Sequence, residues 1–450
     1  MKYAVFALVC LGLVPAAFLC ALSRRAFAWA AAFLVLPVLV YQPTSINFLS
    51  SEWYRGTARG MEVSLIYLVA AVLLLAVLFR GGRIFFFPDA GSRLYLAYFA
   101  WSCLSLVNAA NREYAWLEMW KMIMMAVLFA AVYSWLRLAK DPRPLLAGLA
   151  LVLVASLFSV ARQHVSGVWQ VRGTFPHQNS LALYMLVAAP LFFSAYLNLP
   201  RGGWWGLSAA AFVCGAGCLV RTYSRGALVC FPPALLVVFA LSVRRAFRPR
   251  QLARLVPLAA AGLLALLLLL PRLVERFERA PKSSGETRVE FARCAFNMMA
   301  DEPLVGVGLN NWGVKINPPY PYWIGTGRRE RGGENGPDFK DGIVETVYLL
   351  VGAECGLPAL ALLLAWLGWY LVVCLRLAKR LAGTPLFFLP VGLAGGLAGA
   401  YLQSALEWVL KQPANFSELV ILFAVLSYLN GPGGRAAWWD RGDSNSQPTV

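Results

Sequence analysis

Apolar residues occur along this chain in long runs that are interrupted by short polar segments. A run of roughly 18 or more apolar residues is long enough to cross a hydrocarbon core of about 30 Å as an α-helix. The pattern therefore predicts an all-α polytopic membrane protein with about 12 to 13 transmembrane helices. The predicted spans are 3–22, 26–40, 61–79, 94–108, 119–138, 145–161, 180–197, 206–220, 226–243, 252–271, 346–375, 386–406 and 415–430.

The composition agrees with this class. Hydrophobic residues make up 60% of the chain and charged residues 14%, whereas soluble domains carry about 25% charged residues. The formal net charge of +18 suits basic cytoplasmic loops and also an anionic substrate. We expect no nucleic-acid partner, because no basic face interleaved with aromatic residues occurs on a soluble domain.

The polar residues divide the chain into four parts. About ten transmembrane helices are expected in 1–271, a large loop in 272–343, about three further helices in 344–430, and a disordered polar tail in 431–450. About a dozen of the 22 acidic residues lie between Arg272 and Glu354. A chain that gathers its polar residues between apolar helices is expected to carry its function there.

The distribution of basic residues predicts the orientation. If Arg24 and Arg25 face the cytoplasm, the basic clusters after every second span also face it, as the positive-inside rule requires. The loop 272–343 then lies outside the cytoplasm. The span 346–375 is longer than a bilayer requires, so its first turns are expected to protrude or tilt.

Several arginines on the outer side are not explained by this rule. Arg221 and Arg225 flank the short connection RTYSRGAL, and Arg172 lies in QVRGTFPHQNS. Guanidinium groups match phosphate oxygens, so these arginines are candidates for binding a diphosphate. The alternative is that they only reach lipid headgroups. Arg55 and Arg59 are expected to approach the same cationic pocket.

The sequence SSGETRVEFARCAFNMMADEP predicts an amphipathic helix within the loop. Ser283 or Ser284 is the expected cap, and Arg288 lies near the N-terminal end, where the helix dipole favours anions. The alternative is a solvated arginine. The expected apolar face consists of Val289, Ala292, Phe296 and Met299.

Glu345 and Thr346 precede the long span 346–375. A carboxylate near the bilayer surface is a candidate base for a sugar hydroxyl, whichever way its surroundings shift its pKa. The alternative is a carboxylate that pairs with the helix dipole. Glu354 lies deeper and is expected to be the structural partner of an arginine.

His177 is a second candidate general base or acid, because histidine titrates near neutral pH. The alternative is a solvated histidine, with Asn179 as the cap of the next helix. The nine cysteines are scattered, with no CxxC and no Cys/His ligand spacing, so no metal framework is expected. No cofactor is expected.

Four of these segments occur together in one order. GTFPHQNSLALYM is followed by TYSRGAL, then by TRVEFARCAFNMMADEPLVGVGLNNW, then by VETVYLLVGAECGLPAL. In this the chain resembles the bacterial O-antigen ligase and O-antigen polymerase superfamily of integral-membrane glycosyltransferases. The resemblance covers roughly 173–360. No single element is specific, and it is their order on a protein with many helices that carries the resemblance.

The resemblance implies a GT-C-like membrane fold in the bacterial inner membrane, with an active site that faces the periplasm. The sequence has no DxD motif, so a metal-independent transfer is expected. It implies a donor glycan linked to undecaprenyl diphosphate, a glycan or lipid acceptor, and bound membrane lipid. It also implies that Arg225 and Arg288 hold the diphosphate. Glu345 and Thr346 stand where ligases usually carry His and Asn. Either Glu345 replaces that histidine, or another group does, or the acceptor differs.

Two other function classes compete with a glycosyltransferase. A flippase or transporter of lipid-linked glycans is expected to show charged residues deep in its spans and repeated halves, neither of which is clear in the sequence. A membrane scaffold without catalytic activity leaves the outer arginines unexplained. The sequence therefore favours a polymerase or ligase of an O-antigen-like glycan or exopolysaccharide.

Overall fold

The computed structural model describes residues 2–50, 54, 56–246, 249–278, 282–322 and 342–431. The predicted tail beyond Gly431, the loop segment 323–341 and Arg55 lie outside the described residues. Within the described residues, the fold is helical apart from one small sheet. Strands β1 (Ile46–Phe48) and β2 (Met61–Val63) pair antiparallel, with Ile46 opposite Val63.

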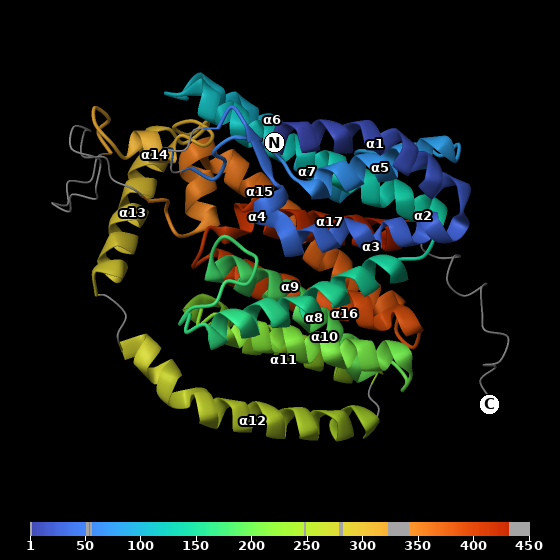
Figure 1. Cartoon of the computed structure of the whole chain (residues 1–450). Helices are drawn as coiled ribbons and strands as arrows, with labels where there is room; N and C mark the ends of the chain where they lie inside the picture. The colour runs from blue at the N-terminus through green and yellow to red at the C-terminus, as the bar shows by residue number, and fades with distance from the viewer. Residues whose placement is uncertain are drawn as a thin grey trace.

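The helices follow one another with short connections (Figure 1). The N-terminal part contains α1 (Lys2–Leu22), α2 (Arg24–Ala30), α3 (Ala32–Val35), η1 (Leu36–Val40), α4 (Tyr41–Thr44), α5 (Leu65–Phe79), α6 (Ala90–Leu104), η2 (Ser105–Val107), α7 (Arg112–Ala139) and α8 (Arg143–Val165). The central part contains α9 (Gln178–Asn198), α10 (Gly203–Arg221), α11 (Arg225–Ala246), α12 (Pro249–Glu278), α13 (Lys282–Asp301) and α14 (Trp312–Lys315). The C-terminal part contains α15 (Val347–Arg380), η3 (Pro385–Phe387), α16 (Phe388–Ser404), η4 (Val409–Lys411) and α17 (Pro413–Asn430).

The all-α polytopic class is confirmed. Eight helices within the described residues are long and apolar enough to cross a membrane, and two shorter apolar helices lie at Phe6–Leu22 and Leu65–Phe79. These ten coincide with ten of the predicted spans. The other three predictions, 26–40, 94–108 and 252–271, fall on helical segments that do not meet the same criteria.

Two predicted spans differ in detail. The span 26–40 is broken into α2, α3 and η1, with Pro37 in the 3-10 turn, where its ring fits the first residues of a helix. The span 61–79 begins in strand β2, and its helix starts only at Leu65. Hydropathy does not distinguish these breaks, because apolar residues fill strand, turn and helix alike.

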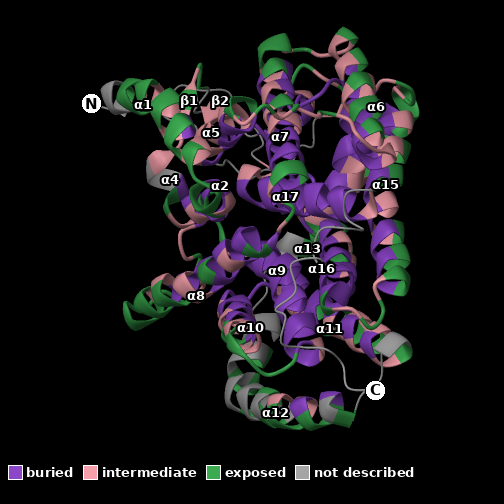
Figure 2. Ribbon diagram, turned by 90° about the vertical axis from the view of Figure 1, so that its right-hand side faces the viewer, coloured by how far each residue is buried: buried purple, intermediate pink, exposed green. Residues whose placement is uncertain are grey.

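The most buried helices are α9, α16 and α17, which occupy the middle of the bundle (Figure 2). α9 packs against α10, α11 and α16, and buried apolar side chains from these helices form one continuous core. Figure 1 shows α12 along one side of the bundle and α13 across one end of it. The helix α13 is therefore placed over the ends of membrane helices rather than among them.

The predicted amphipathic helix is confirmed as α13, but its expected cap is wrong, and of its expected apolar face only Met299 is buried. The helix begins at Lys282, so Ser283 and Ser284 lie inside it. The buried side chains are Phe291, Cys294, Ala295, Met298 and Met299, whereas Val289 and Phe296 are more than half exposed. The helix turned its other side inward because α15, which the local pattern does not reveal, packs there.

A kink in α15 explains why the predicted span 346–375 is longer than a bilayer requires. Gly356 has φ +82° and ψ 171°, which separates two helical segments. The backbone of 303–304 fits against the kink, since Leu357 donates its N–H to the Pro303 carbonyl at 2.8 Å. A Cβ at Gly356 would lie 2.2 Å from the Leu304 oxygen, so only glycine fits. The first segment of α15 thus packs beside the loop instead of extending the span.

Candidate functional site

An arginine and two carboxylates form the centre of the candidate site. The Arg288 guanidinium on α13 forms ion pairs with Glu345, just before α15, and with Glu407, between α16 and η4. Arg288 Nη2 donates to Glu407 Oε1 at 3.4 Å. Arg288 Nε is buried and has no hydrogen-bond partner among the described residues. The guanidinium therefore retains donors for a further anionic oxygen.

Close packing of α13 brings Arg288 and Glu345 together. Phe291, one turn after Arg288, is buried against the segment that leads into α15. A Cβ at Gly342 would lie 2.6 Å from Cζ of Phe291, so the absence of a side chain at Gly342 permits this approach. Glu345 follows three residues later. The packing of Phe291 on Gly342 thus sets the position of the Glu345 carboxylate relative to α13.

Glu407 lies in a buried and highly charged position. The pKa of the Glu407 carboxyl is raised to about 7. Burial is the largest cause and the nearby Glu345 carboxylate adds to it, while Arg288, a hydrogen bond to Asn179 and Arg225 lower the pKa. A carboxyl with a pKa near neutral pH can both accept and return a proton under physiological conditions. Glu407 is therefore a candidate for proton transfer beside Glu345.

The first turn of α11 faces Glu407. A Cβ on Gly226 would lie 3.7 Å from Cγ of Glu407, and Arg225 precedes Gly226 as the first residue of α11. The first backbone N–H groups of a helix lack partners within the helix, and its dipole favours negative charge there. Arg225 and this helix end together make the position attractive to an anion.

The other predicted site residues lie around this centre with different contacts. Arg172 donates to the Pro176 carbonyl at 3.3 Å, and Arg221 lies 3.5 Å from the Tyr223 hydroxyl. The two segments meet where the Trp169 ring stacks on Tyr223, with centroids 5.1 Å apart. Both arginines therefore belong to one neighbourhood, but neither shares the Arg288 ion pairs.

His177 caps α9. Its Nδ1 accepts the backbone N–H of Asn179 at 3.2 Å, and the helix begins at Gln178. The expectation that Asn179 caps this helix is wrong, because His177 already occupies the cap position. Burial and the nearby Arg172 lower the pKa of His177. The imidazole is therefore held neutral, with one ring nitrogen engaged in the cap.

Glu354 is a structural partner, as expected, but its partner is a lysine rather than an arginine. Its Oε1 accepts the backbone N–H of Trp312 at 3.1 Å, and its Oε2 lies 3.9 Å from Lys411 Nζ. Of the two arginines expected near the same cationic pocket, Arg55 lies outside the described residues and Arg59 is exposed. The nearby Thr57 hydroxyl donates to Glu118.

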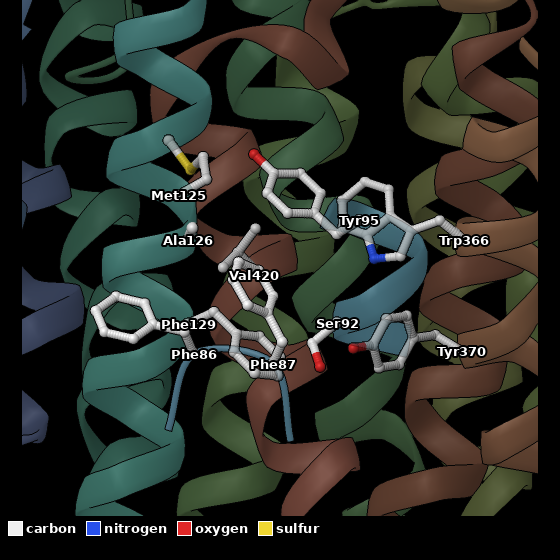
Figure 3. A pocket seen from close by; sticks show the side chains of 10 residues that line it. All are labelled: Phe86, Phe87, Ser92, Tyr95, Met125, Ala126, Phe129, Trp366, Tyr370 and Val420. Atoms are coloured by element: carbon white, nitrogen blue, oxygen red, sulfur yellow. The ribbon is translucent and has the colours of Figure 1, made fainter. Parts of the chain in front are cut away.

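An apolar pocket occurs elsewhere in the bundle, between α6, α7, α15 and α17 (Figure 3). Tyr95, Phe129, Trp366 and Tyr370 contribute aromatic walls. Trp366 in this pocket lies 21 residues after Glu345 along the chain, and 21 residues of helix span on the order of 30 Å. This pocket is separate from the polar centre. Within the described residues, no group of three or more His, Cys, Asp or Glu side chains is arranged to hold a metal ion.

Glu407 is the site residue that the sequence did not reveal. It is a single acidic residue in ALEWVLKQP, next to the predicted span 386–406. Ionisable residues within or beside membrane spans are usually functional, and that rule was a usable signal. The sequence alone gave no reason to connect this short turn with a loop helix more than a hundred residues earlier.

A comparison with protein families matches part of the chain. Residues 210–364 match the family model Wzy_C, described as O-antigen ligase. The matched region includes α11, α13 and the first half of α15, and thereby Arg225, Arg288 and Glu345. His177 and Glu407 lie outside it. No match to a curated protein was found.

Proposed function

Because the chain belongs to the O-antigen ligase and polymerase superfamily, we propose that it is a membrane glycosyltransferase that acts on an undecaprenyl-diphosphate-linked oligosaccharide. The proposed reaction transfers or polymerises the oligosaccharide on the periplasmic face of the bacterial inner membrane. The acceptor is a sugar hydroxyl of another glycan or of a lipid. The product is an O-antigen-like glycan or an exopolysaccharide.

The unpaired Arg288 Nε is the observation that carries this proposal. A buried donor without a partner costs free energy, which a bound anion would recover. Arg225, at the positive end of α11, lowers the pKa of the same Glu407 carboxyl as Arg288 does. We assign both arginines to the diphosphate of the donor, with Arg172 and Arg221 at the edge of the same cationic region.

The proposed reaction is an inverting displacement without a metal ion. The acceptor oxygen attacks the anomeric carbon, and the bond from that carbon to the diphosphate oxygen breaks. The electron pair leaves with the diphosphate, whose growing charge the arginines stabilise. The proton of the attacking hydroxyl passes to a carboxylate. Apolar surfaces of the membrane helices hold the prenyl chain.

We assign the role of base to Glu345, whose carboxylate borders Arg288 at the membrane surface. Glu407 is the second carboxylate of the site, and its pKa of about 7 also suits proton transfer. His177 is the third candidate. Its cap to Asn179 uses one ring nitrogen, and the other is available to a substrate.

The test uses a strain that lacks this gene and carries the wild type, Arg288→Ala or Glu345→Gln. Lipid-linked glycans and surface polysaccharide are extracted and their lengths compared. Arg293→Ala is the matched control, since Arg293 is an exposed arginine on the same helix. We expect both site variants to accumulate undecaprenyl-linked glycan on the outer face, while the control behaves as wild type.

The outcomes separate the alternatives. Short accumulated units indicate a polymerase, and full-length undecaprenyl-linked chains indicate a ligase. Accumulation on the cytoplasmic face instead identifies a flippase and overturns the proposal. Normal polysaccharide from Arg288→Ala, at wild-type protein levels, overturns the assigned role of Arg288.

A further inference from the structure

Four ionisable side chains form a buried cluster beneath the candidate site. Glu118 and Lys121 come from α7, Glu354 from α15 and Lys411 from η4, and none is more than 6% exposed. Lys121 Nζ lies 2.6 Å and Lys411 Nζ 3.1 Å from the Glu118 carboxylate. Lys411 Nζ also lies 3.9 Å from Glu354. We call these four residues the ionic quartet.

The quartet carries two positive and two negative charges, so it is neutral as a whole. Burying charged groups costs several kcal/mol per ion unless they are paired and hydrogen-bonded. Thr57 supplies further bonds, donating its hydroxyl to Glu118 at 2.7 Å and accepting from Lys121 through its carbonyl at 3.1 Å. Apolar side chains of similar size would fill this space at lower cost, which points to a role in specifying geometry.

A chain of contacts, which we call an arm, runs from the quartet to Glu407. Lys411 ends η4 and lies four residues after Glu407. The turn between them is closed by the hydrogen bond from Lys411 N–H to the Trp408 carbonyl, at 3.1 Å. Glu407 N–H in turn bonds to the Gln403 carbonyl at the end of α16, at 2.8 Å. The pairing of Lys411 with Glu118 therefore fixes this turn against α7.

A second arm reaches Arg288. Glu354 accepts the backbone N–H of Trp312 through its side chain, and its own carbonyl accepts the N–H of Gly308 at 2.9 Å. The Trp312 ring packs edge to face on Phe291, with centroids 5.9 Å apart. Phe291 lies on α13, one turn after Arg288. The segment 307–312 thus transmits the position of Glu354 to α13.

We propose that the ionic quartet is a positioning network that holds α13 and the 405–411 turn at the separation where Arg288 meets Glu407. Its residues touch neither member of that pair and act through the two arms. This inference rests on the proposed glycosyl transfer for its catalytic readout. It also assigns Lys121 and Lys411, two outer-side cations, to the fold rather than to the diphosphate.

The test compares purified wild type with Lys411→Met and Glu118→Gln in lipid nanodiscs. The probe is an undecaprenyl-diphosphate-linked oligosaccharide, and kcat and the donor KM are measured from pH 5.5 to 9. We expect each variant to lower kcat at least tenfold and to change KM less than threefold. Lys411→Arg, which keeps the charge, should recover a large part of kcat. Glu113→Gln, an exposed position on α7, is the matched control and should resemble wild type.

The pH profile distinguishes positioning from a direct electrostatic effect. The charged and polar groups that face Glu407 are Glu345, Arg288, Arg225 and Asn179. If the network positions the turn, both variants weaken the contact with Arg288, and both move the acid limb of kcat to higher pH. If the quartet acts only by its charge, loss of a cation and loss of an anion move the limb in opposite directions, which overturns the proposal.

Hydrogen exchange tests whether the quartet holds these segments in place, and it does not require catalytic turnover. In Lys411→Met we expect faster exchange of the backbone amides at 405–412 and 307–314 than in wild type, with other membrane helices unchanged. If Lys411→Met does not fold, the double variant Glu118→Gln/Lys411→Met removes one charge of each sign, and it should show the same faster exchange. Unchanged exchange and kcat in a folded variant overturn the inference. Absence of transfer by wild type contradicts the proposed function alone.

Discussion

Arg288 and Glu407 are 119 positions apart in the sequence, and the Arg288 guanidinium donates to the Glu407 carboxylate at 3.4 Å. One residue belongs to a helix that crosses the end of the bundle, and the other to a short turn between two membrane helices. Their contact defines the centre of the candidate site.

Glu407 gives the site a pH dependence. Its pKa of about 7 means that the carboxylate form, which pairs with Arg288, is populated as the pH rises through about 7. We therefore expect transfer activity to rise across that range in wild type. A loss of roughly 10²- to 10⁴-fold in kcat in Glu407→Gln, with Glu345→Gln less affected, would move the role of base from Glu345 to Glu407. A wild-type profile that is flat between pH 6 and 8 would contradict the part of Glu407 in the pH dependence.

The Glu407 carboxyl also makes the stability of the folded protein fall as the pH rises. The pKa of Glu407 is higher in the folded chain than in the unfolded chain, so its contribution to stability is fully present below the unfolded pKa of about 4.5. The contribution is lost as the pH rises through about 7. We expect the Tm of wild type to fall over this interval relative to Glu407→Gln, measured by thermal unfolding in detergent.

Arg288 is expected to require its guanidinium rather than a positive charge alone. Lysine offers a point charge, whereas arginine offers a planar fork with five donors that can contact two carboxylates and a diphosphate together. Arg288→Lys should therefore leave less than about a tenth of wild-type kcat while the protein is made in normal amounts. Full activity in this variant would show that charge suffices.

Gly342 tests how the approach of α13 positions Glu345. A methyl group there would lie 2.6 Å from the Phe291 ring, so Gly342→Ala should displace the segment that carries Glu345 and lower kcat. The double variant Gly342→Ala/Phe291→Leu relieves the contact and should recover part of the activity. Gly285→Ala on α13 has open space around the new methyl group and is the control.

Gly356 tests the kink of α15. Gly356→Ala places a Cβ against the Leu304 carbonyl at a positive φ and should destabilise the protein by roughly 1–3 kcal/mol. Gly368→Ala lies in the same helix with open space and should leave the Tm unchanged or higher. Equal unfolding temperatures for the two variants would contradict the packing of 303–304 on the kink.

A substitution at His177 distinguishes its role as a helix cap from a catalytic role. Asparagine is among the best helix caps, so His177→Asn preserves the bond to the α9 N-terminus and removes the imidazole. We expect His177→Asn to retain most of the transfer activity and Glu345→Gln to lose it, in the same glycan-extraction assay. A loss of 10²-fold or more in His177→Asn would assign the proton transfer to the histidine.

The sequence by itself determined the class of the protein, the existence of most helices and several of its site candidates. Long apolar runs specify membrane helices because the bilayer leaves no other partner for the backbone. The amphipathic pattern of 282–301 and the arginines around the short connection 221–225 are equally local signals. They suffice to single out Arg288, Arg225 and Glu345 as candidates.

Only the tertiary structure decided which of these residues meet and what surrounds them. The buried side of α13, with Phe291 rather than Val289, depends on α15 lying beneath it. Glu407 and the pairing of Glu118 with Lys411 depend on turns and helices that are far apart along the chain. Hydropathy and periodicity describe neighbours in sequence, whereas an ion pair depends on distance in space, so contacts between remote segments were settled by packing alone.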